Sequence, residues 1–185
     1  DGNIIALGSE YSSSKLFVDK SNLGASFIKS KLPSKSNNKK YMQPINVEIK
    51  PFDEYLELCG EVGIIKLDVE GMEYEVLQGA KKTIKRYAPI ILFEQQLDSF
   101  ENKNSVKTKA TSFLNKHSYK FYLFRYPHTK RGFLKSKVNL LKELIFNSRN
   151  WDVYVEETNH LSYGVYHLVV ALPPNYQKII KKQIL

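Results

Sequence analysis

The sequence predicts a single α/β domain over residues 1–185, and the arrangement of its apolar residues carries that prediction. A continuous apolar run at residues 63–67 is followed by helical periodicity over 72–87 and by a second apolar run, PIILFE, which ends at Glu94. Strand, helix and strand within about 30 residues form a βαβ unit, which requires parallel strands and a right-handed crossover. A chain of 185 residues is long enough for one domain with a substantial core.

The N-terminal part is predicted to consist mainly of strands. Residues 3–7 and 14–18 flank the turn-like GSEYSS and predict a hairpin. Residues 45–49 carry apolar side chains at alternate positions, which is typical of a half-buried strand. Pro51 then suits the first turn of a short helix.

The central helix is predicted to be continuous over residues 72–87. Its apolar side chains recur at intervals of three and four residues, at Met72, Val76, Leu77, Ala80, Ile84 and Tyr87. Acidic residues stand in its first turn and basic residues near its end, which suits the helix dipole. The strand before it, residues 63–67, is apolar apart from Lys66 and is expected to be buried and parallel.

The C-terminal part adds further strands and helices to this unit. We expect, in order, a helix over 106–114, a strand over 119–124, a helix over 134–145, and strands over 151–155 and 164–172. The helix at 134–145 falls in a predicted insertion, residues 130–149. The last two strands have a short polar connection and are therefore expected to be antiparallel to each other. The sheet as a whole is predicted to be mostly parallel, with a late antiparallel strand.

Composition limits the possible functions. The formal net charge of +9 and the pI near 9.4 suit an anionic partner. The lysines are spread over loops and helix faces without a recognition helix or stacking motif, so nucleic acid is the less favoured partner. The single cysteine, Cys59, excludes an intramolecular disulfide and a thiolate zinc site. No apolar run reaches the roughly 20 residues that span a bilayer and no signal segment stands at the start, so we expect a cytoplasmic protein.

Carboxylates gather where the predicted strands end. Asp68 directly follows the strand at 63–67, Glu70 and Gly71 come next, and Glu94 ends the following strand. Ligands of open α/β sheets bind at the carboxyl ends of the strands, so these residues are candidates for holding a hydroxyl group or accepting a proton. A structural role competes, because Asp before a helix is a favoured cap and Glu in the first turn stabilises the dipole. The glutamates further into the helix are assigned that structural role.

No second catalytic or metal-binding motif accompanies these carboxylates. The four histidines form neither an i, i+4 pair nor an HExxH motif, so a protein-bound metal is not expected. His167 lies inside the final strand and is expected to face a sheet surface. The sequence contains neither the GxSxG of hydrolases nor the P-loop of nucleotide phosphatases.

The segment IIKLDVEGMEYEVLQGAKKTIKRYAPIILFE resembles the signature of the FkbM-type methyltransferases. In that signature a strand runs into D-x-E-G, a helix carries E-x-x-x-L-x-G-A, and a second strand ends in Glu. INVEIKPFDEYL is similar to the family's preceding strand and Leu-Asp helix start, with Phe52 in place of the leucine, and NLGASFI and HLVVALP are similar to its Gly-Ala-Ser segment and closing strand. The resemblance covers most of residues 3–174 and stops over 130–149.

The resemblance implies a Rossmann-like class I methyltransferase that uses S-adenosylmethionine, often to methylate a hydroxyl of a sugar or a secondary metabolite. Asp68 matches the Asp that ends the family's fourth strand and faces the cleft, so it is assigned to cofactor binding and catalysis. Glu70 and Gly71 match the Glu-Gly pair and, with Glu94, are assigned to substrate binding. Because methyl transfer needs positioning and a proton acceptor, Asp68 or Glu70 is the expected base or hydroxyl-orienting group.

The chain departs from the family at its N-terminal side. In such enzymes the first strand, the glycine-rich turn that holds the cofactor's methionine end and the acidic residue that holds its ribose all precede the point where this chain starts. No G-x-G pattern occurs in the sequence. We therefore expect an incomplete sheet with an unpaired apolar strand edge, in the carboxyl part of a longer methyltransferase that binds cofactor poorly by itself.

Methyl transfer by the full-length protein is thus the leading hypothesis. A non-catalytic remnant that binds a glycan or a partner chain is the alternative, and a basic nucleic-acid-binding module is a weaker one. Binding that falls steeply with salt would indicate phosphate contacts, whereas retained binding of a neutral sugar in high salt would indicate a glycan site. The sequence leaves the acceptor and the oligomeric state open.

Overall fold

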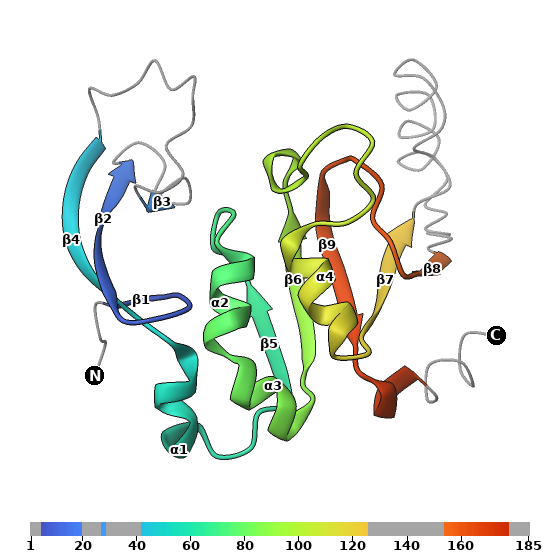
Figure 1. Ribbon diagram of the computed structural model, residues 1–185, viewed down its shortest axis with the longest axis horizontal. Coiled ribbons are helices and arrows are strands. Elements are labelled where there is room, and N and C mark those ends of the chain that lie inside the picture. Colours follow the sequence, from blue (N-terminus) through green and yellow to red (C-terminus); the bar gives the residue numbers. More distant parts are fainter. Residues whose placement is uncertain (1–4, 20–26, 29–41, 126–153, 178–185) are drawn as a thin grey trace, which may run out of the picture.

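The computed structural model describes residues 5–19, 27–28, 42–125 and 154–177. In this part of the chain two β-sheets lie side by side, with helices packed between and beside them (Figure 1). A four-stranded sheet has the strand order β1-β4-β2-β3, and a five-stranded sheet has the order β5-β6-β9-β7-β8. The predicted α/β class is therefore confirmed.

The N-terminal sheet is organised around its longest strand. Its strands are β1 (Ile5–Leu7), β2 (Ser12–Asp19), β3 (Phe27–Ile28) and β4 (Met42–Lys50). The predicted hairpin of the first two strands is wrong, because β4 lies between them and pairs parallel with β1 and antiparallel with β2. Strand β4 is therefore hydrogen-bonded along both of its edges. The alternating pattern over 45–49 lies within it.

The predicted continuous helix is divided in two. After the short helices η4 (Phe52–Tyr55) and α1 (Leu56–Cys59), α2 spans Glu73–Gly79 and α3 spans Lys81–Tyr87. The break falls at Ala80, whose ψ of 16° departs from helical geometry. The carboxylate of Asp53 lies at this break and accepts hydrogen bonds from the backbone N–H groups of Lys82 and Thr83, at 2.7 and 2.9 Å. A distant side chain thus caps α3 where the helical periodicity gives no sign of a break.

The second sheet contains the predicted βαβ unit. Its strands are β5 (Ile64–Leu67), β6 (Ile90–Gln95), β7 (Lys120–Arg125), β8 (Tyr154–Thr158) and β9 (Tyr166–Leu172). The connecting segments include η5 (Leu97–Ser99) and α4 (Lys109–Lys116). Strands β5 and β6 pair parallel, as predicted, with α2 and α3 forming the crossover between them.

The expectation of a mostly parallel sheet needs correction. In the five-stranded sheet, β5–β6 is the parallel pairing, while β6–β9, β9–β7 and β7–β8 are antiparallel. The reason is the position of β9, the predicted late antiparallel strand, which inserts between β6 and β7 and opposes both. The predicted pairing of the last two strands is also wrong, because β7 separates β8 from β9.

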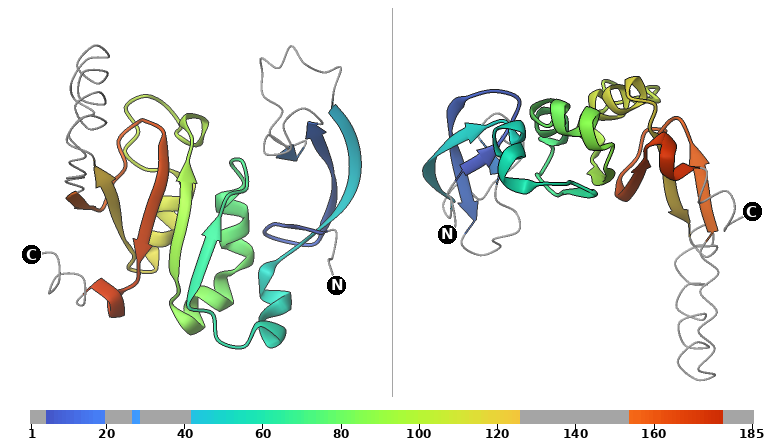
Figure 2. Two further views of the ribbon diagram at one scale, coloured as in Figure 1. Left: turned by 180° about the vertical axis from the view of Figure 1, so that it is seen from behind. Right: turned by 90° about the horizontal axis from the view of Figure 1, so that it is seen from below.

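The core lies between one face of this sheet and helices α2, α3 and α4, which all lie on that side (Figure 2). Its most deeply buried members include Leu77, Ile91, Leu114, Phe121, Leu161, Val169 and Ala171, all at 0% exposure. The opposite face is only partly covered, with Leu168 at 45% and Phe124 at 43% exposure but Tyr122 at 3%. We call this second side the open face.

The strand expected to be buried, β5, is only partly so. It stands at the edge of the sheet in the described part of the chain, and its Ile64 is 64% exposed. An apolar cavity of about 240 Å³ lies beside it and is lined by Leu7 of β1, Phe52 and residues of β5 and α2. Core packing therefore covers only the helix-facing side of β5, through Ile65 and Leu67.

Several predictions concern residues that the structure does not describe or features that it does not test. The predicted helix at 134–145 and the insertion at 130–149 lie outside the described residues, and the assignment of one domain to residues 1–185 stays a prediction. None of the helices in the described ranges is both long and apolar enough to cross a membrane.

Candidate functional site

The turn that follows β5 holds a residue in an unfavourable conformation. The N–H of Met72 donates to the carbonyl of Val69 at 3.2 Å, and both residues between them have positive φ, 48° at Glu70 and 89° at Gly71. Glycine adopts this region freely, but for a residue with a side chain it costs roughly 1–2 kcal/mol. Strain of this kind is retained where the surrounding structure requires it, and it is often found at functional sites.

A buried carboxylate stabilises this turn. Glu73 is 4% exposed, and its Oε1 accepts a hydrogen bond from the N–H of Gly71 at 3.0 Å. The helix-dipole role assigned to this first-turn glutamate is therefore incomplete, because the side chain also fixes the backbone beside Glu70. Gly71, predicted to bind substrate, is buried and supplies its N–H to Glu73.

The predicted site carboxylates gather at the end of the sheet where β5 and β6 have their carboxyl ends. Strands β5 and β6 end at the same edge (Figure 1), which places Asp68 and Glu94 near each other with Glu70 in the adjoining turn. The pKa of the Glu70 carboxyl is raised, first by partial desolvation and then by the negative charges of Glu94 and Asp68. The Asp68 side chain is 62% exposed, and its Oδ2 lies 3.6 Å from the Lys66 ammonium. We call Asp68, Glu70 and Glu94 the acidic edge.

Glu94 has polar partners that the sequence did not predict. Its Oε1 accepts a hydrogen bond from Nε2 of Gln96 at 2.7 Å and lies 3.4 Å from Nδ1 of His167. The expectation that His167 faces a sheet surface is confirmed by its 89% exposed side chain. Its contact with Glu94 was missed, because β9 was expected to pair with the strand before it rather than with β6.

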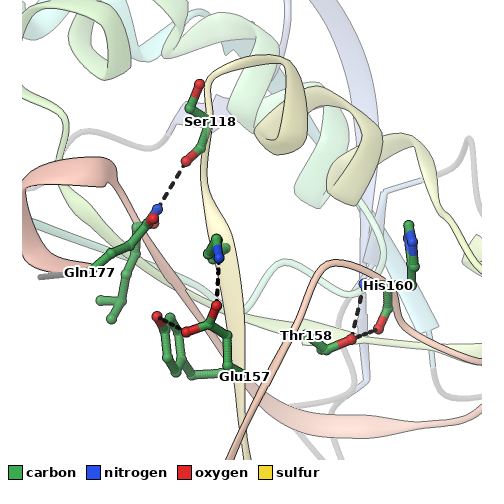
Figure 3. Close-up of polar contacts among 8 residues, drawn as sticks. Ser118, Glu157, Thr158, His160 and Gln177 are labelled. Atoms are coloured by element: carbon green, nitrogen blue, oxygen red, sulfur yellow. Dashed lines mark hydrogen bonds and ion pairs between the residues drawn. The ribbon is translucent and has the colours of Figure 1, made fainter. Parts of the chain in front are cut away.

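A second polar cluster, on β7 and β8, is satisfied internally (Figure 3). Glu157 accepts hydrogen bonds from Lys120 at 2.5 Å and from the hydroxyl of Tyr122 at 2.9 Å. Burial, followed by the bond to Glu157, raises the pKa of Tyr122 to about 12. At 3% exposure Tyr122 is too enclosed to stack on a ligand, so this cluster has a structural role.

A groove of about 700 Å³ lies elsewhere, between α2, α3, α4 and the loop after β6. Burial and the nearby Lys81 and Lys85 lower the pKa of His117 on its wall, yet Asp98 and Glu101 line the same groove with the opposite charge. It lacks a strained backbone and contains no member of the acidic edge. The acidic edge is therefore the stronger candidate for chemistry. Among the described residues, no group of three or more His, Cys, Asp or Glu side chains is arranged to hold a metal ion.

Comparison with known proteins assigns the chain to a family. Residues 3–121 match the family described as the methyltransferase FkbM domain, which is more than half of the 185 residues. The matched segment contains the whole acidic edge, with the strained turn and both strands that end there. No curated protein and no solved structure matches the chain. The protein belongs to the methyltransferase FkbM domain family.

Proposed function

We propose that the full-length protein transfers a methyl group from S-adenosylmethionine to a hydroxyl group of a sugar or of a secondary metabolite. The observation that carries this proposal is the strained Glu70 in the acidic edge, within a chain that belongs to a methyltransferase family. A backbone conformation that disfavours a side chain, occupied by a carboxylate whose pKa is raised, is typical of a residue retained for function.

The charge of the acidic edge suits the cofactor. S-adenosylmethionine carries a sulfonium and an ammonium group, and the mutual repulsion that raises the Glu70 pKa is relieved when a cation binds among the carboxylates. Asp68 is the group we assign to holding the cofactor, because its side chain is exposed at the end of β5 and its ion pair, with Lys66, is itself solvated. When bound there, the cofactor supplies an electrophilic methyl group.

The remaining carboxylates are assigned to the acceptor. Glu94 lies in strand β6, and Glu70 lies in the turn closed by the bond from Met72 to Val69, on the same edge as Asp68. Holding a hydroxyl group at a defined distance from a reactive methyl group is the larger part of catalysis in such a transfer. A carboxylate that accepts the hydroxyl hydrogen also increases the nucleophilicity of its oxygen.

Binding of S-adenosylmethionine to the full-length protein tests this assignment. Replacing Asp68 with Asn removes a negative charge and should weaken binding about tenfold, which corresponds to about 1.4 kcal/mol. Asp98→Asn is the matched control, since this exposed aspartate lies in η5 outside the acidic edge. Isothermal titration calorimetry gives both affinities. Equal affinities for the wild-type and Asp68→Asn proteins, or no binding by the wild type, would contradict the proposal.

A further inference from the structure

Strand β9 contains an irregularity at the point where it reaches the acidic edge. Phe93 of β6 pairs with Val169, but Gln95, two residues on, pairs with Tyr166, which is three residues back along β9. The extra residue forms a β-bulge, with both Leu168 and His167 opposite Glu94. Bulges of this kind redirect side chains and are frequent beside active sites.

The bulge changes the face on which His167 lies. Val169 and Ala171 point into the core, both at 0% exposure. Strict alternation would place residue 167 on the same buried side, because side chains on a strand repeat with a period of two. Instead His167 and Leu168 are both exposed. Because of the bulge, the imidazole of His167 lies on the open face beside Glu94 rather than on the core side of the sheet.

The imidazole has one ring nitrogen engaged and one available. Nδ1 faces Oε1 of Glu94 at 3.4 Å, and the same oxygen is held by Gln96. Among the described residues, Nε2 has no hydrogen-bond partner. A carboxylate that orients one nitrogen of a histidine and leaves the other free is the arrangement of a general base. The length of the Nδ1 contact is compatible with this role, because such bonds often tighten only when substrate is bound.

We propose that His167, oriented by Glu94, accepts the proton of the acceptor hydroxyl group during methyl transfer. This inference rests on the proposed function and replaces the carboxylate proton acceptor expected from the sequence with an imidazole. His167 also lies beyond residues 3–121, the segment that matches the family, so the match does not assign it. Glu94 is in this account a positioning residue, while Asp68 and Glu70 hold the cofactor and the acceptor.

The step balances in atoms and charge. The hydroxyl proton moves to Nε2 of His167, which becomes an imidazolium stabilised by the Glu94 carboxylate. The oxygen's electron pair forms the new bond to carbon, and the electron pair of the breaking carbon–sulfur bond stays on the sulfur of the sulfonium donor. The imidazolium afterwards releases its proton to solvent, which its exposed position permits.

The tautomer of His167 gives a test that does not depend on turnover. With Nδ1–H donating to Glu94, the neutral ring should carry its proton on Nδ1, whereas free histidine prefers Nε2–H. Nitrogen-15 NMR of the 185-residue chain distinguishes these forms. Glu94→Gln keeps an acceptor oxygen and should preserve the Nδ1–H form, while Glu94→Leu should lose it. Detection of the Nε2–H form in the wild-type protein would overturn the proposal.

Kinetics of the full-length protein give the second test. With labelled S-adenosylmethionine and a panel of free hexoses and methyl glycosides as acceptors, His167→Ala should lower kcat about 100-fold, the usual contribution of a general base, with little change in KM. Imidazole added to the medium should restore part of the rate of His167→Ala, which a merely structural role would not allow. His160→Ala is the matched control, because His160 is exposed and its contacts to Thr158 are made by its backbone (Figure 3).

The outcomes separate the two proposals. Transfer by the wild type with unchanged kcat in His167→Ala would overturn the role of His167 and leave the proposed function standing. Absence of transfer by the wild type with every acceptor tested would contradict both. Loss of activity in His167→Ala without rescue by imidazole, together with a changed thermal unfolding midpoint, would assign the residue to structure and overturn its catalytic role.

Discussion

Glu70 combines three properties that rarely occur together in one surface residue. It has positive φ, it lies next to two other carboxylates, and its pKa is raised by desolvation and by those neighbours. Each property costs free energy of folding, and within the described part of the chain no hydrogen bond of the Glu70 side chain offsets these costs. These costs support the proposed role of Glu70 in holding the acceptor.

This interpretation predicts a pH-dependent gain in stability on replacing Glu70 with Gln. A carboxyl group whose pKa is raised in the folded state disfavours folding once the pH exceeds the ordinary value of about 4.3. The wild-type protein therefore carries a penalty at pH 7 that is absent near pH 3. Because the side chain is exposed and screened by water, we expect Glu70→Gln to gain only a few tenths of a kcal/mol, on the order of a weak surface interaction.

Urea unfolding at both pH values measures the gain. Glu61→Gln is a suitable control, because Glu61 is exposed in the loop before β5 and lies outside the acidic edge. A gain in Glu70→Gln that is equal at pH 3 and pH 7 would show that charge repulsion is not its source.

Candidate site residues could be located from the sequence only where their position depends on neighbouring residues in the chain. Asp68 and Glu94 were found because each closes an apolar run, and parallel strands bring such ends together. The partner of Glu94, His167, could not be found in the same way, because its position depends on a bulge in a strand that is distant in sequence. The continuous apolar run after it, LVVAL, has no alternation from which the face of each residue could be predicted.

Among the secondary-structure elements, the break between α2 and α3 depends most clearly on a side chain from elsewhere in the chain. Asp53 receives three hydrogen bonds there, from the backbone N–H groups of Lys82 and Thr83 and from the Thr83 hydroxyl at 2.7 Å. In the sequence this aspartate belongs to the Leu-Asp helix start that resembles the family. Its structural role in this protein is to cap a helix that begins far along the chain.

Replacing Asp53 with Ala should therefore destabilise the fold. The change leaves two N–H groups at the start of α3 without their acceptor, so we expect a loss of about 1–3 kcal/mol in the free energy of unfolding. Glu57→Ala is the control. The Glu57 side chain forms an exposed ion pair with Arg86 at 3.9 Å, so its loss should cost less than about 0.5 kcal/mol. Chemical denaturation compares the two variants, and equal costs would contradict the capping role.

The contact between α2 and the chain after β1 depends on a glycine. A methyl group on Gly79 would lie 1.9 Å from the carbonyl oxygen of Gly8, and both positions are fixed by backbone. Although alanine favours a helix by about 1 kcal/mol over glycine, this overlap forces the two elements apart.

Gly79→Ala is accordingly expected to lower the free energy of unfolding by about 1–3 kcal/mol or more, the usual cost of overpacking. Gly63→Ala provides the comparison, because a methyl group there meets no atom within 4 Å. Thermal unfolding of both variants measures the difference. A Gly79→Ala protein as stable as Gly63→Ala would mean that β1 does not pack on α2 as described.

At the scale of the whole molecule, the sequence predicted the class of fold better than its pairing. The βαβ unit was recovered because its periodicities are local, and the strand β9 was expected to be antiparallel. The order of the strands was not predicted. Strand β4 lies between β1 and β2, and β9 lies between β6 and β7, and these pairings join segments that are distant in sequence, so no local pattern indicates them. The antiparallel pairing of β6 and β7 with β9 follows from the second insertion, whereas the first makes β1 and β4 a parallel pair.

The same arrangement explains how the candidate site is built at the carboxyl ends of β5 and β6. Parallel strands β5 and β6 bring their carboxyl ends together, and the antiparallel β9 begins at that edge, so it adds His167 from the other direction. The helices on the opposite side of the sheet leave the open face accessible (Figure 2). Ligand binding at this edge therefore needs no rearrangement of the core.

The most direct test of the central claim is methyl transfer from labelled S-adenosylmethionine by the full-length protein, measured for the wild type and for Asp68→Asn with a panel of sugar acceptors. We expect the wild type to label at least one acceptor. At a cofactor concentration well below saturation, Asp68→Asn should lose about tenfold in rate, the factor by which its binding of S-adenosylmethionine weakens, with an unchanged thermal unfolding midpoint. Equal transfer by Asp68→Asn would remove Asp68 from the mechanism, and no transfer by the wild type would contradict the proposed activity itself.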